Sequence, residues 1–342
     1  MSFRSVSGAC ALIGAAMLSA NAMAADAALI AAAKKEASVN WYTTQIVNQF
    51  VVPAAAAFEK KYGVKVNYVR AENAEVMLRL MEESKAGKIV GDVFDGTSAS
   101  ALVKAGLVLK WQPDTIAEMP AEWRDPNGYW SPTNIYVLTP GINTNLVPKG
   151  TEPKSHLDLL DPKWKGKIVW AGRQATSAAP GFIGSALAAL GDEKGMAYLR
   201  DLSKQNIAAI GVSARVVLDQ VIAGEYAIGL NIFNHNTTIS AAQGAPTTWL
   251  PFNPSLTVFS VAAVLKDAPH PNAAKLLVDY FVSEEGQQRY RDAEYISVHP
   301  KVPPRDPALR PDGVRFKGLF VGPDEVDQKI GAWWKIYQEI FR

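Results

Sequence analysis

Short apolar runs alternate with helical patterns through the first hundred residues, and this rhythm restricts the folds open to the chain. We expect strands at residues 39–42, 64–69 and 89–94, and helices at residues 54–62, 74–85 and 98–105. Gly63, Gly87 and Gly106 stand where these helices would end. Strands separated by helices form parallel sheets with helices on both faces. The amino-terminal half therefore predicts an α/β fold.

The middle of the chain repeats the pattern. Further strands are expected at residues 134–138, 167–170 and 226–231, with helices at residues 181–190, 196–202 and 213–224. Beyond Leu265 the pattern becomes helical, with Pro271 at one predicted helix start and Ser283 as the predicted cap of the next. Pro53 either kinks a helix begun near Gln45 or marks the first turn of a later one.

The segment KIGAWWKIYQEIFR, residues 329–342, carries a single apolar stripe. The stripe consists of Ile330, Trp333, Trp334, Tyr337, Ile340 and Phe341. Such a stripe covers either the protein's own core or a membrane surface. We expect it to pack on the core.

The first residues have the pattern of a secretory leader. Arg4 precedes an apolar run at residues 9–18, and Ala22-Met23-Ala24 forms a small-residue cleavage pattern. We predict a signal peptide at residues 1–24 and a protein exported to the periplasm. Cys10, the only cysteine, falls inside this leader, so the mature chain would have no disulfide and no thiolate nucleophile. No later run reaches the roughly 18 apolar residues that a membrane-spanning helix needs.

Length and charge bound the class of protein. Removing 24 leader residues from 342 leaves 318, a length that suits two lobes of ordinary domain size. The formal charge of +2 falls to +1 without Arg4, and the charged residues of both signs are interspersed. Nucleic-acid binding requires a basic stripe, which this sequence does not have. A nucleic-acid partner is therefore not expected, and we expect a monomer.

Polar and cationic residues gather after the predicted strands. Ligands of open parallel sheets bind beyond the carboxyl ends of the strands, where helix N-termini also lie. The candidate ligand-binding residues at these positions are Tyr42, Thr43, Thr44, Arg70, Thr97, Ser98, Arg173, Ser177, Ser213, Arg215, Asn231, Asn234 and His235. Any one hydroxyl or amide could simply cap a helix, and Arg215 could pair with Asp219 one turn on. Together they predict a cleft whose arginines suit a carboxylate or phosphate.

Signs of catalysis are few. The sequence contains no nucleophile elbow, phosphate-binding loop, dinucleotide fingerprint or zinc-protease motif. A hydrolase would have to use Thr44, Ser98 or Ser177 with His235 as a distant base. We therefore predict no enzyme, no cofactor and no resident metal.

Six phrases together resemble the extracellular solute-binding proteins of ABC importers. They are VNWYTTQ, GDVFDGTSASALVKAGLV, PTNIYVLTPGINTNLVP, HLDLLDPKWKGKIVW, VLDQVIAGEYAIGL and HPNAAKLLVDYFVSEEGQQ. The resemblance is strongest to the branch of ferric-iron, phosphonate and sugar-phosphate binders. It implies a type 2 periplasmic binding fold with two α/β lobes, a solute cleft between them and a membrane permease as partner. The expected lobes are residues 25–135 plus 262–342, with the carboxyl-terminal helices mainly on this lobe, and residues 136–261.

The resemblance also implies what the ligand is not. The family's iron binders use two adjacent tyrosines, a histidine and a glutamate, and those motif positions correspond here to Phe233 and Asn234, to Ile46 and to Thr97. Ferric iron favours anionic oxygen donors, which none of these residues offers. We therefore expect an organic solute bearing an oxyanion, such as a phosphonate, phosphate ester or carboxylate. Ferric iron is the alternative ligand, and a receptor for a membrane sensor kinase the alternative role.

Overall fold

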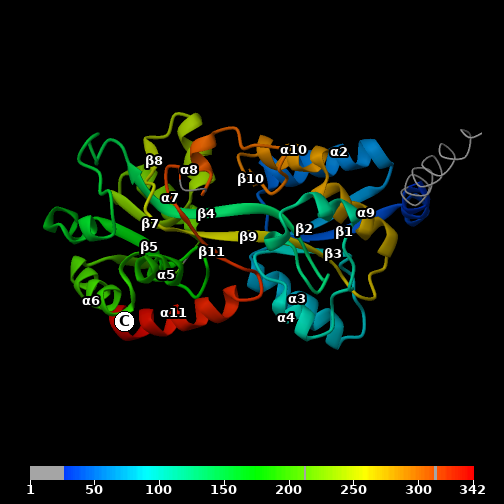
Figure 1. Ribbon diagram of the computed structural model, residues 1–342, viewed down its shortest axis with the longest axis horizontal. Coiled ribbons are helices and arrows are strands. Elements are labelled where there is room, and N and C mark those ends of the chain that lie inside the picture. The colour runs from blue at the N-terminus through cyan, green and yellow to red at the C-terminus, as the bar shows by residue number, and fades with distance from the viewer. Residues whose placement is uncertain (1–26, 212, 312–313) are drawn as a thin grey trace, which may run out of the picture.

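The computed structural model describes residues 27–211, 213–311 and 314–342, and Figure 1 shows their arrangement. The predicted leader and Cys10 lie outside the described residues. Among the described residues, strands join into one mixed sheet that runs along the long axis of the molecule, with helices on both faces. This is the α/β architecture that the alternating pattern predicts.

The sheet has a parallel group of strands at each end. Its order is β2-β1-β3-β9-β4-β7-β5-β6, with β8 and β10 also paired to β4 and with β11 paired to β9. The strands are β1 (Ser38–Thr43), β2 (Lys65–Arg70), β3 (Val93–Gly96), β4 (Ser131–Asn143), β5 (Ile168–Ala171), β6 (Ala208–Ile210), β7 (Ile228–Phe233), β8 (Thr247–Trp249), β9 (Ser255–Val264), β10 (Ile296–Ser297) and β11 (Gly318–Val321). We call β1, β2 and β3 the first parallel group and β5, β6 and β7 the second.

Two long antiparallel strands, β4 and β9, connect these groups. One edge of β9 pairs with β3, and one edge of β4 pairs with β7. Every residue of both strands is buried, which explains why neither strand shows the apolar and polar alternation of a half-exposed strand. The parallel strands of both groups thereby direct their carboxyl ends toward the middle of the molecule.

Helices follow most of the parallel strands, as predicted. They are α2 (Val52–Tyr62), α3 (Asn73–Lys85), α4 (Ser100–Lys104), α5 (Ala179–Leu190), α6 (Asp192–Leu202), α7 (Ala214–Ala223), α8 (Asn234–Ala242), α9 (Pro271–Val282), α10 (Glu284–Asp292) and α11 (Val326–Phe341). Residues 27–36 are also helical. Pro271 starts α9, and the Ser283 hydroxyl caps α10 by accepting the Gly286 N–H at 3.2 Å.

Two local predictions needed adjustment. Pro53 lies at the start of α2, directly after a π-helical stretch at Val47–Val51, so the helical path begins before the proline. The third strand starts at Val93 rather than at residue 89, because the N–H groups of Val90 and Gly91 point to the Glu83 carboxylate instead of a neighbouring strand.

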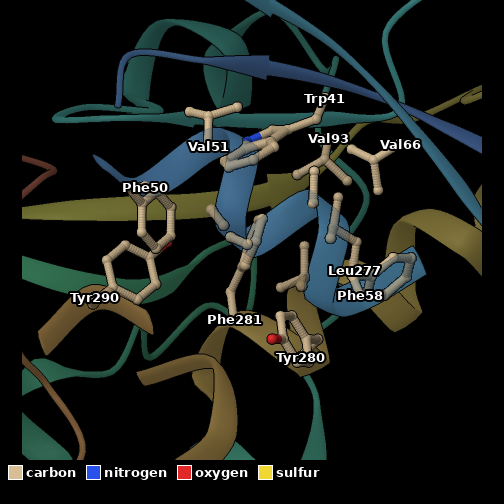
Figure 2. Close-up of a cluster of buried hydrophobic side chains, with 14 of the residues drawn as sticks. Trp41, Phe50, Val51, Phe58, Val66, Val93, Leu277, Tyr280, Phe281 and Tyr290 are labelled. Atoms are coloured by element: carbon tan, nitrogen blue, oxygen red, sulfur yellow. The ribbon is translucent and has the colours of Figure 1, made fainter. Parts of the chain in front are cut away.

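The core beside the first parallel group is aromatic (Figure 2). Trp41 on β1 lies 4.8 Å from Phe281 on α9, and Phe50 stacks on Tyr290 of α10 at 4.0 Å between ring centroids. Buried rings of this kind contribute large apolar area and favour tilted or edge contacts. These contacts hold helices α9 and α10 on the first parallel group.

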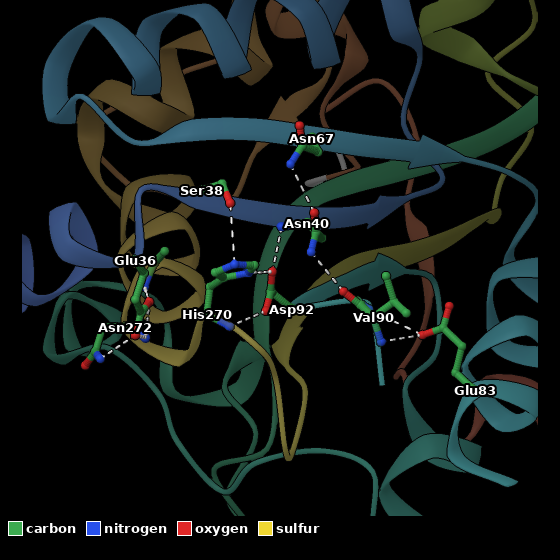
Figure 3. Close-up of polar contacts among 11 residues, drawn as sticks. Glu36, Ser38, Asn40, Asn67, Glu83, Val90, Asp92, His270 and Asn272 are labelled. Carbon is green, nitrogen blue, oxygen red and sulfur yellow. Dashed lines mark hydrogen bonds and ion pairs between the residues drawn. The ribbon is translucent and has the colours of Figure 1, made fainter. Parts of the chain in front are cut away.

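Polar groups fasten α9 to the amino-terminal ends of the same strands (Figure 3). The fully buried Asp92 carboxylate accepts the backbone N–H groups of Asn40 and His270, both at 2.7 Å, and contacts His270 Nδ1 at 2.8 Å. Glu36 accepts the first free N–H groups of α9, from Asn272 and Ala273. These contacts satisfy donors that a helix start otherwise leaves unpaired.

Helix α11 does not follow α9 and α10 onto the first group. After β11 pairs with the β9 residues 255–258, the chain places α11 against α5, where Trp333 lies over Gly184. The predicted stripe does pack on the core, since Ile330 and Tyr337 are both buried. The expectation that the carboxyl-terminal helices pack mainly on the first lobe is wrong for α11, because α5 offers a glycine where the broad Trp333 ring needs room.

The amino-terminal end of α11, with the residues just before it, contacts the segment that follows β3 of the first parallel group. Ser98 Oγ donates to Asp327 Oδ2 at 2.8 Å, and Ser100 Oγ donates to the Pro323 carbonyl at 3.0 Å. Helix α11 therefore touches both parallel groups. Among the described helices, none is long and apolar enough to cross a membrane.

Candidate solute cleft

A cavity of about 910 Å³ opens where the carboxyl ends of the two parallel groups face each other. Its first wall comes from the segments after β1, β2 and β3 together with α3. Its second wall comes from the β5–α5 segment and from the starts of α7 and α8, while β4, β9 and α11 complete the floor and one side. This is the position at which open parallel sheets bind ligands.

Eight of the thirteen candidate residues line this cavity. They are Thr44, Arg70, Thr97, Arg173, Ser177, Ser213, Arg215 and His235. The first three lie at or directly after the ends of strands of the first parallel group, and the other five follow strands of the second. The fold thus gathers donors from strand ends that are far apart in the sequence.

Tyr42 and Thr43 are not among the lining residues, because their side chains have other partners. The Tyr42 hydroxyl donates to Glu83 at 2.6 Å, and the guanidinium of Arg79 covers its ring. The hydroxyl of Thr43, which is fully buried, donates to Asp95 at 2.8 Å. Both side chains support the strand end, and only the next residue, Thr44, reaches the cavity.

Three other candidates also stand behind the wall. Ser98 is fully buried and donates to Asp327. Asn231, with a left-handed φ of 60°, donates to the carbonyls of Thr176 and Ala178 and so fixes the segment that carries Ser177. Asn234 is buried at the first position of α8. Structural roles therefore explain Ser98 and Asn231, in line with the sequence-based alternative that such a side chain only supports the local backbone.

The cavity wall carries three arginines. Arg70 and Arg173 come from opposite sides, and the Glu72 carboxylate lies between them, at 3.1 Å from Arg70 and 3.6 Å from Arg173. Arg215 pairs with Asp219 at 2.5 Å, as one alternative predicted, and donates to Ser240 Oγ at 3.0 Å. A guanidinium fork suits planar or tetrahedral oxyanions. The wall can therefore supply several fixed donors to an anionic group.

Aromatic rings form the floor beside these donors. Tyr136 lies 5.1 Å from Phe233, and His235 lies 4.6 Å from Tyr295, measured between ring centroids. Burial lowers the pKa of His235 to about 3, so its ring is neutral at ordinary pH. The floor thus offers an apolar, uncharged surface for an organic group.

A buried carboxyl group supports the first strand end from below. Asp95 accepts from Trp41 Nε1 at 2.6 Å and from the Thr43 hydroxyl and the Thr44 N–H. Burial raises the pKa of Asp95 to about 6, although its hydrogen-bond donors act in the opposite direction. This network fixes the backbone that presents Thr44.

Some lining residues gave no usable sequence signal. Tyr136 lies inside the apolar run of β4, and Tyr295 follows α10 rather than a parallel strand. Asp327 and Ile330 reach the cavity from α11. Glu72 follows β2 beside Arg70, so the strand-end rule that selected Arg70 could also have selected it.

The residues at the family's iron-ligand positions lie mostly at the cavity. Ile46, Thr97 and Phe233 line it, and Asn234 does not. Within the described ranges, no three histidine, cysteine, aspartate or glutamate side chains come together as a metal-holding group.

Comparison with known proteins identifies the family. A family model described as bacterial extracellular solute-binding protein matches residues 86–315, which is more than half of the chain. The Fe(3+)-binding periplasmic protein of Serratia marcescens is 25% identical over 68% of this chain and 70% of its own length. The putative 2-aminoethylphosphonate-binding periplasmic protein of Salmonella typhimurium is 23% identical over 82% and 80%, respectively.

A solved structure confirms the predicted fold. The periplasmic binding protein AfuA of Actinobacillus pleuropneumoniae, with exogenous fructose-6-phosphate bound, is 24% identical and covers 89% of this chain and 98% of its own. The TM-score of 0.72 establishes that the two chains share the periplasmic binding protein fold. With the family match, the fold and a cavity at the meeting strand ends, the chain belongs to the bacterial extracellular solute-binding proteins.

Proposed function

We propose that this protein captures a small organic solute bearing an oxyanion and delivers it to the permease of an ABC importer. The observation that carries the proposal is the cavity itself, where Arg70, Arg173 and Arg215 face an aromatic floor. The arginines can hold the anionic group, and Tyr136 and Phe233 can cover an organic body. Relatives named for ferric iron and for 2-aminoethylphosphonate support a periplasmic transport role.

The proposed mechanism is closure of two lobes around the solute. We assign the first lobe to the segments around β1, β2 and β3 with α9 and α10, and the second to residues 136–261 with α11 added. The expected lobe boundaries at residues 135/136 and 261/262 fall within β4 and β9. A solute that contacts both walls binds the closed form better and shifts the population toward it. The closed, loaded monomer would then be the form that the permease engages.

Ferric iron remains the competing ligand. It is supported by the Serratia relative and by two carboxylates on the wall, Glu72 and Asp327. Against it, Phe233 and Ile46 offer no donor at positions where iron binders of the family carry ligands. An oxyanion suits the arginines better than a cation does.

Among the described residues, one arrangement supports a hydrolase. Ser38, His270 and Asp92 follow one another at 3.4 Å and 2.8 Å (Figure 3). Asp92 also accepts two backbone N–H groups, and the three residues lie at the amino-terminal ends of the strands, away from the cleft. We assign this group to holding α9, and we propose a binding protein without catalytic activity.

A ligand panel tests the proposal. We expect 2-aminoethylphosphonate, fructose 6-phosphate, inorganic phosphate or citrate to raise the melting temperature, because a ligand of the native state stabilises it. Arg173→Gln should weaken binding of the responding compound about 10-fold to 100-fold in calorimetric titration, since a charge-assisted hydrogen bond contributes roughly 1.5–3 kcal/mol. The matched control is Lys204→Gln, which removes an exposed cation that pairs only with Asp201. Stabilisation by ferric citrate alone, with no response to iron-free citrate, would contradict the proposal.

A further inference from the structure

Glu72 occupies an anion site built from three sources. Its carboxylate accepts the backbone N–H at the third position of α3, in a capping box with Glu75. Arg70, on the same segment, donates to it at 3.1 Å, and Arg173 contacts it from the opposite wall at 3.6 Å. A helix N-terminus with two guanidinium groups is a strong combination for binding an anion. Here the protein's own side chain fills that position.

The site is part of the solute cavity and remains accessible. Arg70, Glu72 and Arg173 all line the cavity, and about a third of each side chain is exposed. Partly exposed ion pairs contribute only up to about 1 kcal/mol, so an incoming anion can displace this one. Arg215, in contrast, has Asp219 on its own helix as a fixed partner.

We propose that the Glu72 carboxylate is an internal competitor that occupies Arg70 and Arg173 until a solute oxyanion replaces it. This inference rests on the proposed function and adds a specificity rule to it. A solute with one carboxylate would exchange one carboxylate for another and gain little. A phosphoryl or phosphonyl dianion brings a second charge and a third oxygen, and it therefore displaces Glu72 more effectively. The selected solutes are dianionic oxyanions.

The contact between Glu72 and the two arginines could have either of two roles, and these predict opposite changes in affinity when the charge of Glu72 is removed. If Glu72 served mainly to tie the two walls together in the bound form, removing its charge would weaken binding. If it competes with the solute, removing its charge strengthens binding. Glu72→Gln keeps one oxygen that can accept the helix N–H, removes the negative charge and replaces the other oxygen with an NH2 group that cannot accept from an arginine. Glu75→Gln is the matched control, because Glu75 belongs to the same capping box and, among the ion pairs of the described residues, Arg70 and Arg173 contact Glu72 instead.

The experiment is a calorimetric titration of the full chain with inorganic phosphate as probe. We expect Glu72→Gln to bind phosphate about five-fold to ten-fold more tightly than the wild type and Glu75→Gln. The gain should disappear in the double variant Glu72→Gln, Arg173→Gln. Methylphosphonate and acetate are titrated in parallel. The wild type should bind the methylphosphonate dianion more tightly than acetate, and the ratio of the two affinities should be smaller in Glu72→Gln.

Equal or weaker phosphate binding by Glu72→Gln would overturn the inference, provided that its melting temperature without phosphate stays close to that of Glu75→Gln. If the melting temperature falls, Glu72→Ser, which retains a good cap, replaces it in the same titration. The proposed function is judged separately by the wild type. A wild type that binds no organic oxyanion, beside a variant that gains phosphate binding, would reject the proposed solute and keep the role of Glu72.

Discussion

The protonation state of His235 decides where positive charge stands in the cleft. Its ring is buried against Tyr136, Phe233 and Tyr295, and burial lowers its pKa to about 3. A neutral imidazole cannot act as a cationic anchor at neutral pH, so the proposed oxyanion would have to be held by the arginines and by uncharged donors. His235 instead completes the aromatic floor.

This state has a consequence for stability against acid. An unfolded histidine titrates near pH 6.5, so between that pH and about 3 the unfolded chain binds a proton that the native chain does not. The contribution is complete above pH 6.5 and is lost as the pH falls toward 3. Between pH 7 and pH 4 the free energy of unfolding should fall in both proteins. We expect the decrease in His235→Phe to be about 3 kcal/mol smaller than the decrease in the wild type. Urea unfolding at both values checks this; parallel losses in the two proteins would refute it.

The limits of sequence reasoning at this scale follow from side-chain direction. The location of Arg173, Arg215 and Thr44 at the cavity could be predicted, because the end of a strand in an α/β sheet defines an approximate position for the residues that follow it. Tyr42 could not be separated from Thr44, because residues two positions apart in a strand point to the same face and the last paired residue cannot be read from the pattern. The Tyr42 hydroxyl donates to Glu83 on α3, which lies 41 residues later in the chain.

At the level of elements, the predicted helices and strands were mostly correct, and the placement of α11 was not. Its stripe shows that one face is buried but not which surface buries it. That surface is α5, which lies about 150 residues earlier and is identified only by Gly184 beneath Trp333. Local patterns contain no information about such a pairing.

A pair of glycine substitutions tests this packing. A Cβ at Gly184 would stand 2.3 Å from the Trp333 ring, so Gly184→Val should destabilise the protein by about 1–3 kcal/mol through overpacking. Gly331 lies within α11 itself, where an added Cβ meets nothing closer than 4.0 Å. Gly331→Ala should therefore be neutral or stabilise by up to about 1 kcal/mol. Unchanged unfolding of Gly184→Val in urea would show that α11 does not rest on α5 as described.

At the scale of the whole molecule, the alternating pattern was enough to predict two parallel groups and a cleft where they meet. It could not predict that β4 and β9 join the groups into one sheet, since these strands pair antiparallel across more than a hundred residues. Nor could the pattern predict that β11 pairs with residues 255–258 of β9, because β11 has only four residues and no distinctive pattern.

The proposed closure predicts a change in overall dimensions. We expect a saturating solute from the ligand panel to reduce the radius of gyration measured by small-angle X-ray scattering, because both walls must approach one molecule. Arg173→Gln at the same solute concentration should contract less, since fewer molecules are occupied. A radius that stays constant at saturation in the wild type would mean that the cleft binds without closing.

Helix α11 also links completion of the cleft to the order of synthesis. It follows every strand of the sheet in the chain, yet it supplies Asp327 and Ile330 to the cavity and contacts both parallel groups. A nascent chain that has emerged as far as β11 already possesses all the strands but lacks one side of its binding site. We therefore expect premature termination or proteolytic trimming before Val326 to yield a nearly full-length chain that has every described strand and lacks the side of the proposed solute site that α11 provides.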